Sequence, residues 1–105
     1  MKKRIGVIMY QTSKSKGQEL VAQRMVRGFI KLGNEAYLIT SLYHDGVEII
    51  SPESLDEGRG YTYSEDSELG IPVIRVNSYV TRWPPRSIVF KDFIRTLESI
   101  VNEFR

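Results

Sequence analysis

A run of small and polar residues follows the first apolar segment and holds most of the candidate chemistry of the chain. It reads Gln11-Thr12-Ser13-Lys14-Ser15-Lys16-Gly17, directly after residues 5–9. Hydroxyl groups, lysines and a glycine ahead of a helix are groups that bind phosphate in many proteins. The spacing matches neither a Walker A sequence nor Gly-x-Gly-x-x-Gly. A phosphate-binding loop and an ordinary solvated loop are therefore both open interpretations.

The neighbouring residues predict a strand–helix–strand unit that places this loop. Residues 5–9 form a continuous apolar run, which predicts a parallel strand covered on both faces. The next segment has the apolar spacing of a helix that ends at Gly33, and residues 36–40 predict a second strand. The predicted core side chains of the helix are Leu20, Val21, Met25, Phe29 and Leu32, and those facing water are Gln23, Arg24, Arg27 and Lys31. Ligands of parallel sheets bind at the carboxyl ends of the strands, where this loop begins.

The remaining segments extend the pattern to β-α-β-loop-β-α. Residues 43–69 are acidic and rich in turn residues, and we expect a mobile insert in which residues 47–50 form either a short strand or an extension of the loop. Residues 71–76 predict a third strand, 77–86 a loop, and 87–103 a helix with Ser87 as N-cap. We therefore predict one α/β domain over residues 1–105, with a small parallel Rossmann-like sheet. Because the pattern stops on a helix, we expect the fold to be incomplete and its sheet edge and the stripe around Phe93, Leu97 and Phe104 to need cover.

Composition excludes several classes of chemistry. The 105 residues include no cysteine and one histidine, so disulfides, thiol nucleophiles and a zinc site made of cysteines are ruled out. The charge is segregated: residues 1–40 hold eight Lys/Arg and two Glu, whereas residues 41–70 hold eight Asp/Glu and one Arg. A basic first unit suits phosphate groups or an anionic membrane surface, although solvated faces of a single domain explain it equally. Recognised nucleic-acid motifs are absent, and we expect no nucleic-acid partner.

Three ordered segments resemble a known family. Lys16-Gly17-Gln18-Glu19, Gly33-Asn34-Glu35-Ala36 and Gly70-Ile71-Pro72-Val73-Ile74-Arg75-Val76 are similar to the Gly-Gly-x-Glu loop, the Gly-His-Glu-Val turn and the third strand of GT-B glycosyltransferases of the family-4 type. The resemblance covers the first part of their N-terminal, acceptor-side domain, apart from the acidic insert. Lys16 replaces the first glycine of the pair, and Asn34 replaces the family histidine.

The resemblance implies a set of site residues. Lys16, Gly17, Gln18 and Glu19 would line the cleft and bind the donor phosphates, because a helix N-terminus offers free N–H groups there. Four further residues are candidates for binding the acceptor: His44, Arg75, Arg82 and Trp83. Each has a plainer interpretation: a surface histidine in a turn, arginines paired with the acidic insert, and a tryptophan that caps the core. No catalytic residue is assigned, since the family's histidine and Glu-x7-Glu motif lie beyond this region.

The resemblance implies a transferase that moves a sugar from a nucleotide-sugar donor to an unknown acceptor. The donor-binding C-terminal domain would then be a missing partner, and the isolated chain is expected to be inactive. We expect no metal or other cofactor, and a cytoplasmic or membrane-peripheral location. A membrane surface and a second copy of the chain are the further candidate partners. The alternative is a standalone Rossmann-like or flavodoxin-like module that binds a phosphate-bearing ligand or a partner protein.

Overall fold

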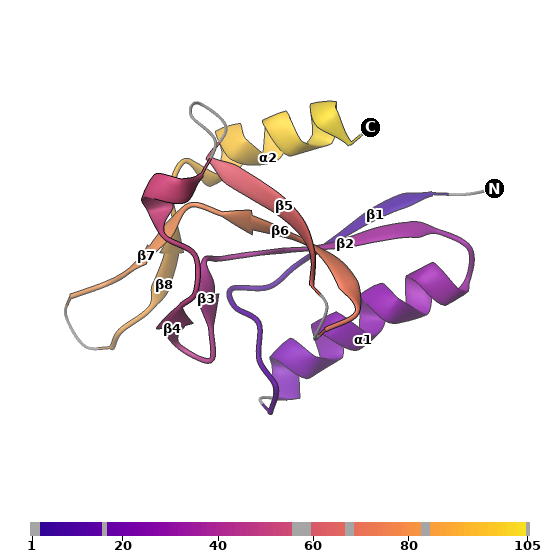
Figure 1. Ribbon diagram of the computed structural model, residues 1–105, viewed down its shortest axis with the longest axis horizontal. Helices are drawn as coiled ribbons and strands as arrows, with labels where there is room; N and C mark the ends of the chain where they lie inside the picture. Colours follow the sequence, from indigo (N-terminus) through magenta and orange to yellow (C-terminus); the bar gives the residue numbers. More distant parts are fainter. Residues whose placement is uncertain (1–2, 16, 56–59, 67–68, 83–84, 105) are drawn as a thin grey trace.

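A four-stranded sheet forms the centre of the molecule (Figure 1). The computed structural model describes residues 3–15, 17–55, 60–66, 69–82 and 85–104. Three strands of the sheet are parallel and the fourth, at one edge, is antiparallel to its neighbour. In spatial order they are β1 (Arg4–Ile8), β2 (Glu35–Thr40), β6 (Ile71–Val76) and β5 (Tyr61–Asp66).

The three parallel strands match the predicted ones to within one residue, but the sheet is mixed rather than parallel. The antiparallel strand, β5, lies inside the segment predicted to be an acidic insert. It ends at Asp66 and β6 begins at Ile71, and a connection this short joins antiparallel strands. Gly70 helps the chain to reverse there, since its φ is +69°. The rest of the predicted insert also contains short elements, and residues 56–59 and 67–68 lie outside the described residues. Its mobility stays a prediction.

Helix α1 (Gly17–Lys31) covers one face of the sheet and ends as the sequence predicts. Gly33 has a φ of +92°, and its N–H donates to Ile30 O over 3.0 Å. The predicted core face, however, is wrong in part. Ala22 and Val26 pack on the sheet together with the polar residues Glu19 and Gln23, while Val21, Met25 and Leu32 are exposed. The helix is thus rotated about its axis relative to the prediction, and the Gln23 amide is directed at the loop before the helix, as described below.

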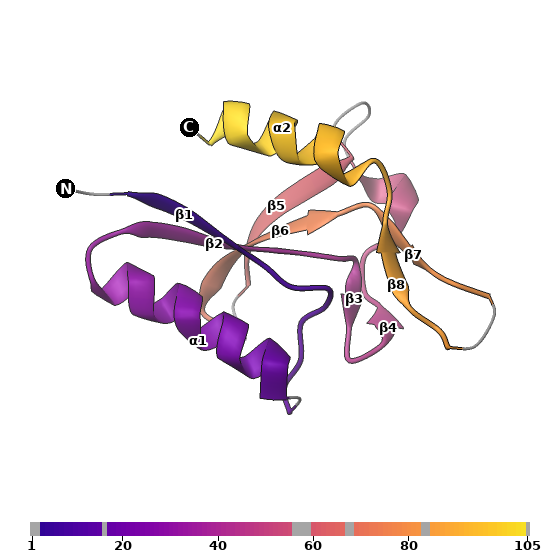
Figure 2. The same ribbon diagram turned by 180° about the vertical axis from the view of Figure 1, so that it is seen from behind.

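Helix α2 (Phe93–Glu103) covers the opposite face of the sheet (Figure 2). Ile100 packs with Ile39 and Ile74, and Phe104 lies 5.2 Å from Tyr37 between ring centroids. The helix begins six residues later than predicted, after Asp92, whose φ of +45° turns the chain. Of the stripe expected to need cover, Phe93, Leu97 and Phe104 are partly buried against this core. The exposed apolar residues of the helix are Ile94 and Val101.

Two small hairpins lie beyond the carboxyl ends of the parallel strands (Figure 1). The first follows β2, and the second follows β6 where a loop and the start of a helix were predicted. Ile88-Val89-Phe90 is strand rather than helix because it pairs with residues 78–80, and Lys91 N then donates to Asn77 O over 2.9 Å. The hairpin strands and one short helix are β3 (Tyr43–His44) with β4 (Val47–Glu48), β7 (Ser78–Val80) with β8 (Ile88–Phe90), and the 3₁₀ helix η1 (Pro52–Ser54).

Strand β1 lies at the edge of the sheet, and one of its two faces is exposed, which corrects the expectation that both faces are covered. Its burial alternates along the strand, and Ile8 is 48% exposed. Bonds from Glu35 N to Lys3 O and from Met9 N to Ile39 O direct the odd-numbered residues toward β2. The backbone groups of Arg4, Gly6 and Ile8 therefore face away from the sheet. Across the residues that the structure describes, neither helix combines the length and apolar character needed to span a bilayer.

Candidate functional site at the carboxyl edge

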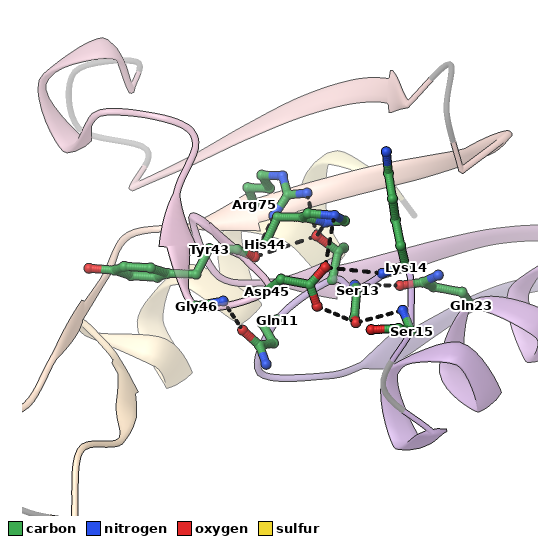
Figure 3. Close-up of polar contacts among 11 residues, drawn as sticks. Gln11, Ser13, Lys14, Ser15, Gln23, Tyr43, His44, Asp45, Gly46 and Arg75 are labelled. Carbon is green, nitrogen blue, oxygen red and sulfur yellow. Dashed lines mark hydrogen bonds and ion pairs between the residues drawn. The ribbon is translucent and has the colours of Figure 1, made fainter.

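Backbone hydrogen bonds join the polar loop after β1 to the β3–β4 hairpin (Figure 3). Thr12 N donates to Tyr43 O over 3.2 Å, and Asp45 N donates to Thr12 O over 2.9 Å. These bonds join the loop to the β3–β4 hairpin. Gln11, Thr12 and Ser13 are buried as a result. The fully solvated loop that the sequence left open is therefore excluded for its first half.

The side chain of Arg75, in β6, forms hydrogen bonds with this loop and with the chain that follows β2. The residue is only 2% exposed, and its guanidinium donates to Ser41 O over 2.8 Å and to Tyr43 O over 3.3 Å. Its other terminal nitrogen donates to Thr12 Oγ1 over 2.9 Å. The charged group of Arg75 is thus directed at groups of the protein itself, and its predicted acceptor role stays a prediction. Arg75 is a positioning residue.

His44 and Asp45 complete the network on the solvent side of Arg75. The His44 ring nitrogen Nδ1 lies 2.7 Å from Thr12 Oγ1, and Nε2 lies 3.5 Å from an oxygen of the Asp45 carboxylate. The side chains of Arg75 and His44 therefore both contact this hydroxyl. His44 is thus partly buried and engaged within the loop. Its predicted acceptor role stays a prediction.

The Asp45 carboxylate occupies the position in the loop where a ligand anion was expected. The Ser13 hydroxyl donates to one of its oxygens, and Lys14 N donates to the other over 3.3 Å. Two more amides of the loop are also engaged: Ser13 N donates to Gln23 Oε1 over 3.0 Å, and Ser15 N to Ser13 Oγ over 3.1 Å. A phosphate at this point of the loop would have to displace a carboxylate of the same chain.

The four residues predicted to bind donor phosphate are not all brought together. Gly17 is exposed at the start of α1, and no atom lies within 4 Å of the place where a Cβ would be. Gln18 is exposed beside it, whereas Glu19 is buried. Lys16 lies outside the described residues. Gly17 and Gln18 therefore share an open surface with the free edge of β1, and Glu19 belongs to the interior.

Glu19 accepts a hydrogen bond from Tyr10 at the end of β1. This bond, with smaller contributions from burial and from the negative charge of Glu19, raises the pKa of the Tyr10 phenol above its ordinary value of 10.0. Since Tyr10 is 43% exposed, the pair reaches from the core to the surface. It ties the end of β1 to the first turn of α1.

A groove opens between the loop and the β7–β8 hairpin. It has a volume of about 710 Å³ and is lined by Tyr10, Gln11, Gly46, Val80, Arg86, Ser87 and Ile88. None of these residues was predicted as a site residue, although Gln11 stands directly after the first strand, where a functional side chain is expected. Of the predicted acceptor residues in the second hairpin, Arg82 is exposed outside this lining. Trp83 lies outside the described residues.

Comparison of the chain with protein-family models, with curated proteins and with solved structures gave no match. The site is therefore interpreted from its own geometry. Within the described part of the chain, no three His, Asp or Glu side chains come together as they would around a metal ion. The groove itself is lined by hydrogen-bonding side chains of Gln11, Arg86 and Ser87 and by apolar side chains of Val80 and Ile88.

Proposed function

We propose that this chain is part of a glycosyltransferase that moves a sugar from a nucleotide-sugar donor to an acceptor, and that it forms the acceptor side of the reaction cleft. The observation that carries the proposal is the gathering of one polar loop and two hairpins around a groove at the carboxyl edge of three parallel strands. Ligands of open α/β sheets bind at this edge. The resemblance of Gly17-Gln18-Glu19 and Gly33-Asn34-Glu35 to the family supplies the reaction type.

The strand order supports a Rossmann-like assignment. The three parallel strands lie in the order in which they occur along the chain, β1-β2-β6. In the common doubly wound order, 3-2-1-4-5-6, three such strands form one half of the sheet and the crevice opens beside the first of them. Tyr10 and Gln11, which follow β1, would then stand at the mouth of that crevice. The antiparallel β5 is an addition at the far edge.

Gly17 is the residue best placed to admit a donor. In the proposed reaction an acceptor hydroxyl attacks the anomeric carbon, and the bond from that carbon to a diphosphate oxygen breaks. The leaving nucleoside diphosphate gathers negative charge, which the amide groups and positive end of a helix stabilise. Open space around Gly17 lets a phosphate approach the first turn of α1 closely. A side chain at this position would fill the space without disturbing the fold.

The test is a transfer assay on the product of the whole reading frame that encodes this chain, with radiolabelled UDP- and GDP-sugars. We expect Gly17→Leu to lower the transfer rate about 100-fold, because it keeps the donor from its reactive position. Gly28→Leu is the matched control, since Gly28 also has no atom within 4 Å of its Cβ position but lies mid-helix on an exposed surface. Both variants should melt close to the wild-type temperature.

Two outcomes would overturn the proposal. Equal transfer by the Gly17→Leu and Gly28→Leu variants would remove Gly17 from the donor site. No transfer with any nucleotide sugar would favour the alternative, a module that binds a phosphate-bearing ligand or a protein. The isolated 105-residue chain is expected to bind UDP- and GDP-sugars only weakly, because the donor domain would be elsewhere. Tight binding would contradict that assignment.

A further inference from the structure

The groove between the loop and the β7–β8 hairpin has two chemically different walls. Val80 and Ile88 supply apolar surface from the hairpin. Gln11, Arg86 and Ser87 supply hydrogen-bond donors, and no acidic residue is among the lining residues. Its volume of about 710 Å³ is within the usual range for small-molecule sites. The walls therefore suit a molecule with one apolar face and one negatively charged group.

Gln11 is the fixed donor of the groove. The residue is 4% exposed, and its side-chain oxygen Oε1 accepts a hydrogen bond from Gly46 N over 2.7 Å. Only the oxygen of the amide can accept, so this bond sets the amide orientation. Figure 3 shows the nitrogen Nε2 on the side away from Gly46. Nε2 has no hydrogen-bond partner among the described residues and is not one of their fully buried polar atoms, so it is open to the groove and can donate to an acceptor there.

Arg86 supplies the positive charge of the groove. It is exposed just before β8 and makes no ion pair with any residue that the structure describes. The guanidinium of Arg75, by contrast, donates hydrogen bonds to backbone carbonyl groups. Arg86 and Gln11 both line the groove, from different parts of the chain. An arginine together with an amide N–H group suits phosphate and carboxylate oxygens.

We propose that this groove is the acceptor subsite and that the acceptor is phosphorylated. The phosphate oxygens accept hydrogen bonds from Gln11 Nε2 and from the Arg86 guanidinium, while the apolar face of the acceptor lies on Val80 and Ile88. Naming the ligand an acceptor rests on the proposed glycosyltransferase function. Binding of the phosphorylated molecule itself does not. The phosphate belongs either to a soluble sugar phosphate or to a lipid headgroup, and one experiment distinguishes them.

The experiment is a nuclear magnetic resonance titration of the full 105-residue chain labelled with nitrogen-15. Glucose 6-phosphate is the probe, glucose the neutral control, and phosphatidylglycerol vesicles the lipid probe. Glucose 6-phosphate, but not glucose, should shift the Gln11 side-chain amide and the Arg86 Nε–H signals. If the vesicles alone give an effect that depends on Gln11, the phosphate comes from a lipid. If only the sugar phosphate does so, it is soluble.

Matched variants decide between this site and general attraction of anions. Gln11→Glu keeps the oxygen that accepts from Gly46 N but replaces the donor by a negative charge, and Arg86→Ala removes the cation. Each should weaken binding about tenfold. Asn102→Asp and Arg95→Ala make the same kinds of change at exposed positions of α2 and should leave affinity unchanged. Equal weakening by all four variants would overturn the proposal, as would the absence of any shift in the Gln11 signal.

The titration and the transfer assay together distinguish failure of the phosphate-site proposal from failure of the proposed glycosyltransferase function. Transfer by the whole reading frame, combined with no phosphate binding in the groove, would mean that the transferase uses an uncharged acceptor. Binding that depends on Gln11, combined with no transfer, would keep the phosphate site and remove the transferase. Each result therefore eliminates one of the two proposals.

Discussion

The two walls of the groove are built in opposite ways. The first half of the loop after β1 is buried, and side chains from two other parts of the chain contact it, with Arg75, His44 and Asp45 engaged around Thr12 and Ser13. The β7–β8 hairpin is short and carries exposed Arg82 and Arg86. The charged residues around the loop therefore serve structure, whereas in our proposal Arg86 of the hairpin region binds a ligand together with Gln11 of the loop. The same residue type, arginine, takes both roles within 11 positions of sequence.

The largest expected difference between the walls is in their arginines. Arg75→Met should lower the free energy of unfolding by about 3 kcal/mol, because it removes hydrogen bonds from a charged donor and leaves buried carbonyl groups unpaired. Arg86→Met should change stability by less than about 0.5 kcal/mol, as surface substitutions do. Urea unfolding of both variants measures this. Similar losses would contradict the assignment of Arg75 as the positioning residue.

Threonine hydroxyls give a second, smaller contrast. Thr12 is fully buried and accepts from Arg75, whereas Thr81 accepts from Ser87 N over 2.9 Å at the more open hairpin. Thr12→Val keeps the shape and should cost about 2 kcal/mol, since a charged donor loses its buried partner. Thr81→Val should cost about 0.5 kcal/mol because water can replace the lost acceptor. Thermal unfolding followed by circular dichroism ranks the two, and the reverse order would refute the contrast.

A third contrast is between two glycines, Gly46 and Gly28, which have different backbone conformations. Gly46 has a φ of +80° and supplies the N–H that orients Gln11, while no atom crowds its Cβ position. Gly46→Ala should therefore cost about 1 kcal/mol, purely from the left-handed backbone. Gly28→Ala, in ordinary helical backbone, should instead stabilise the protein by about 1 kcal/mol. Calorimetry of the two alanine variants should give shifts of opposite sign. Shifts of the same sign would show that Gly46 does not need its conformation.

The smallest effect concerns pH at the end of β1. Because Glu19 raises the Tyr10 pKa above 10.0, the folded state holds that proton more tightly than the unfolded state. The stabilisation is fully present below the unfolded pKa and is lost as pH rises through the folded one. The stability difference between wild type and Tyr10→Phe should thus be constant near neutral pH and shrink in strong alkali. Near-ultraviolet titration of a Glu19→Gln variant should show Tyr10 ionising at lower pH than in wild type.

The sequence was sufficient for the elements whose patterns are local. The three parallel strands are apolar runs, and the end of α1 is marked by Gly33. Their positions therefore follow from residues that are close together in the sequence. Strands β5, β7 and β8 were missed because they are short, polar or interrupted, and exist only through pairing with distant residues. The predicted start of the last helix at residue 87 failed for the same reason.

The position of the polar loop at the carboxyl edge could be predicted, but its internal contacts could not. The carboxyl-edge loop is where strand order put it, yet Gln23 was expected to face water. It is buried because Ser13 N needs an acceptor, a requirement that only the folded loop creates. Arg75 did carry a signal, since a charge inside the apolar run Val73-Ile74-Arg75-Val76 must find partners. Gln11 was part of the predicted loop, but the orientation of its side chain could not be predicted, because it depends on a single amide 35 residues away.

The bond between Arg75 and Thr12 spans 63 positions of sequence. Contacts this distant form only after the intervening chain has closed, and closure of long segments slows folding. During synthesis the first strand, α1 and the second strand leave the ribosome before β6 exists. The loop that forms one wall of the groove thus cannot take its final shape until the third parallel strand has docked. The groove that we propose as a ligand site is consequently completed late in synthesis, together with the last strand of the parallel core.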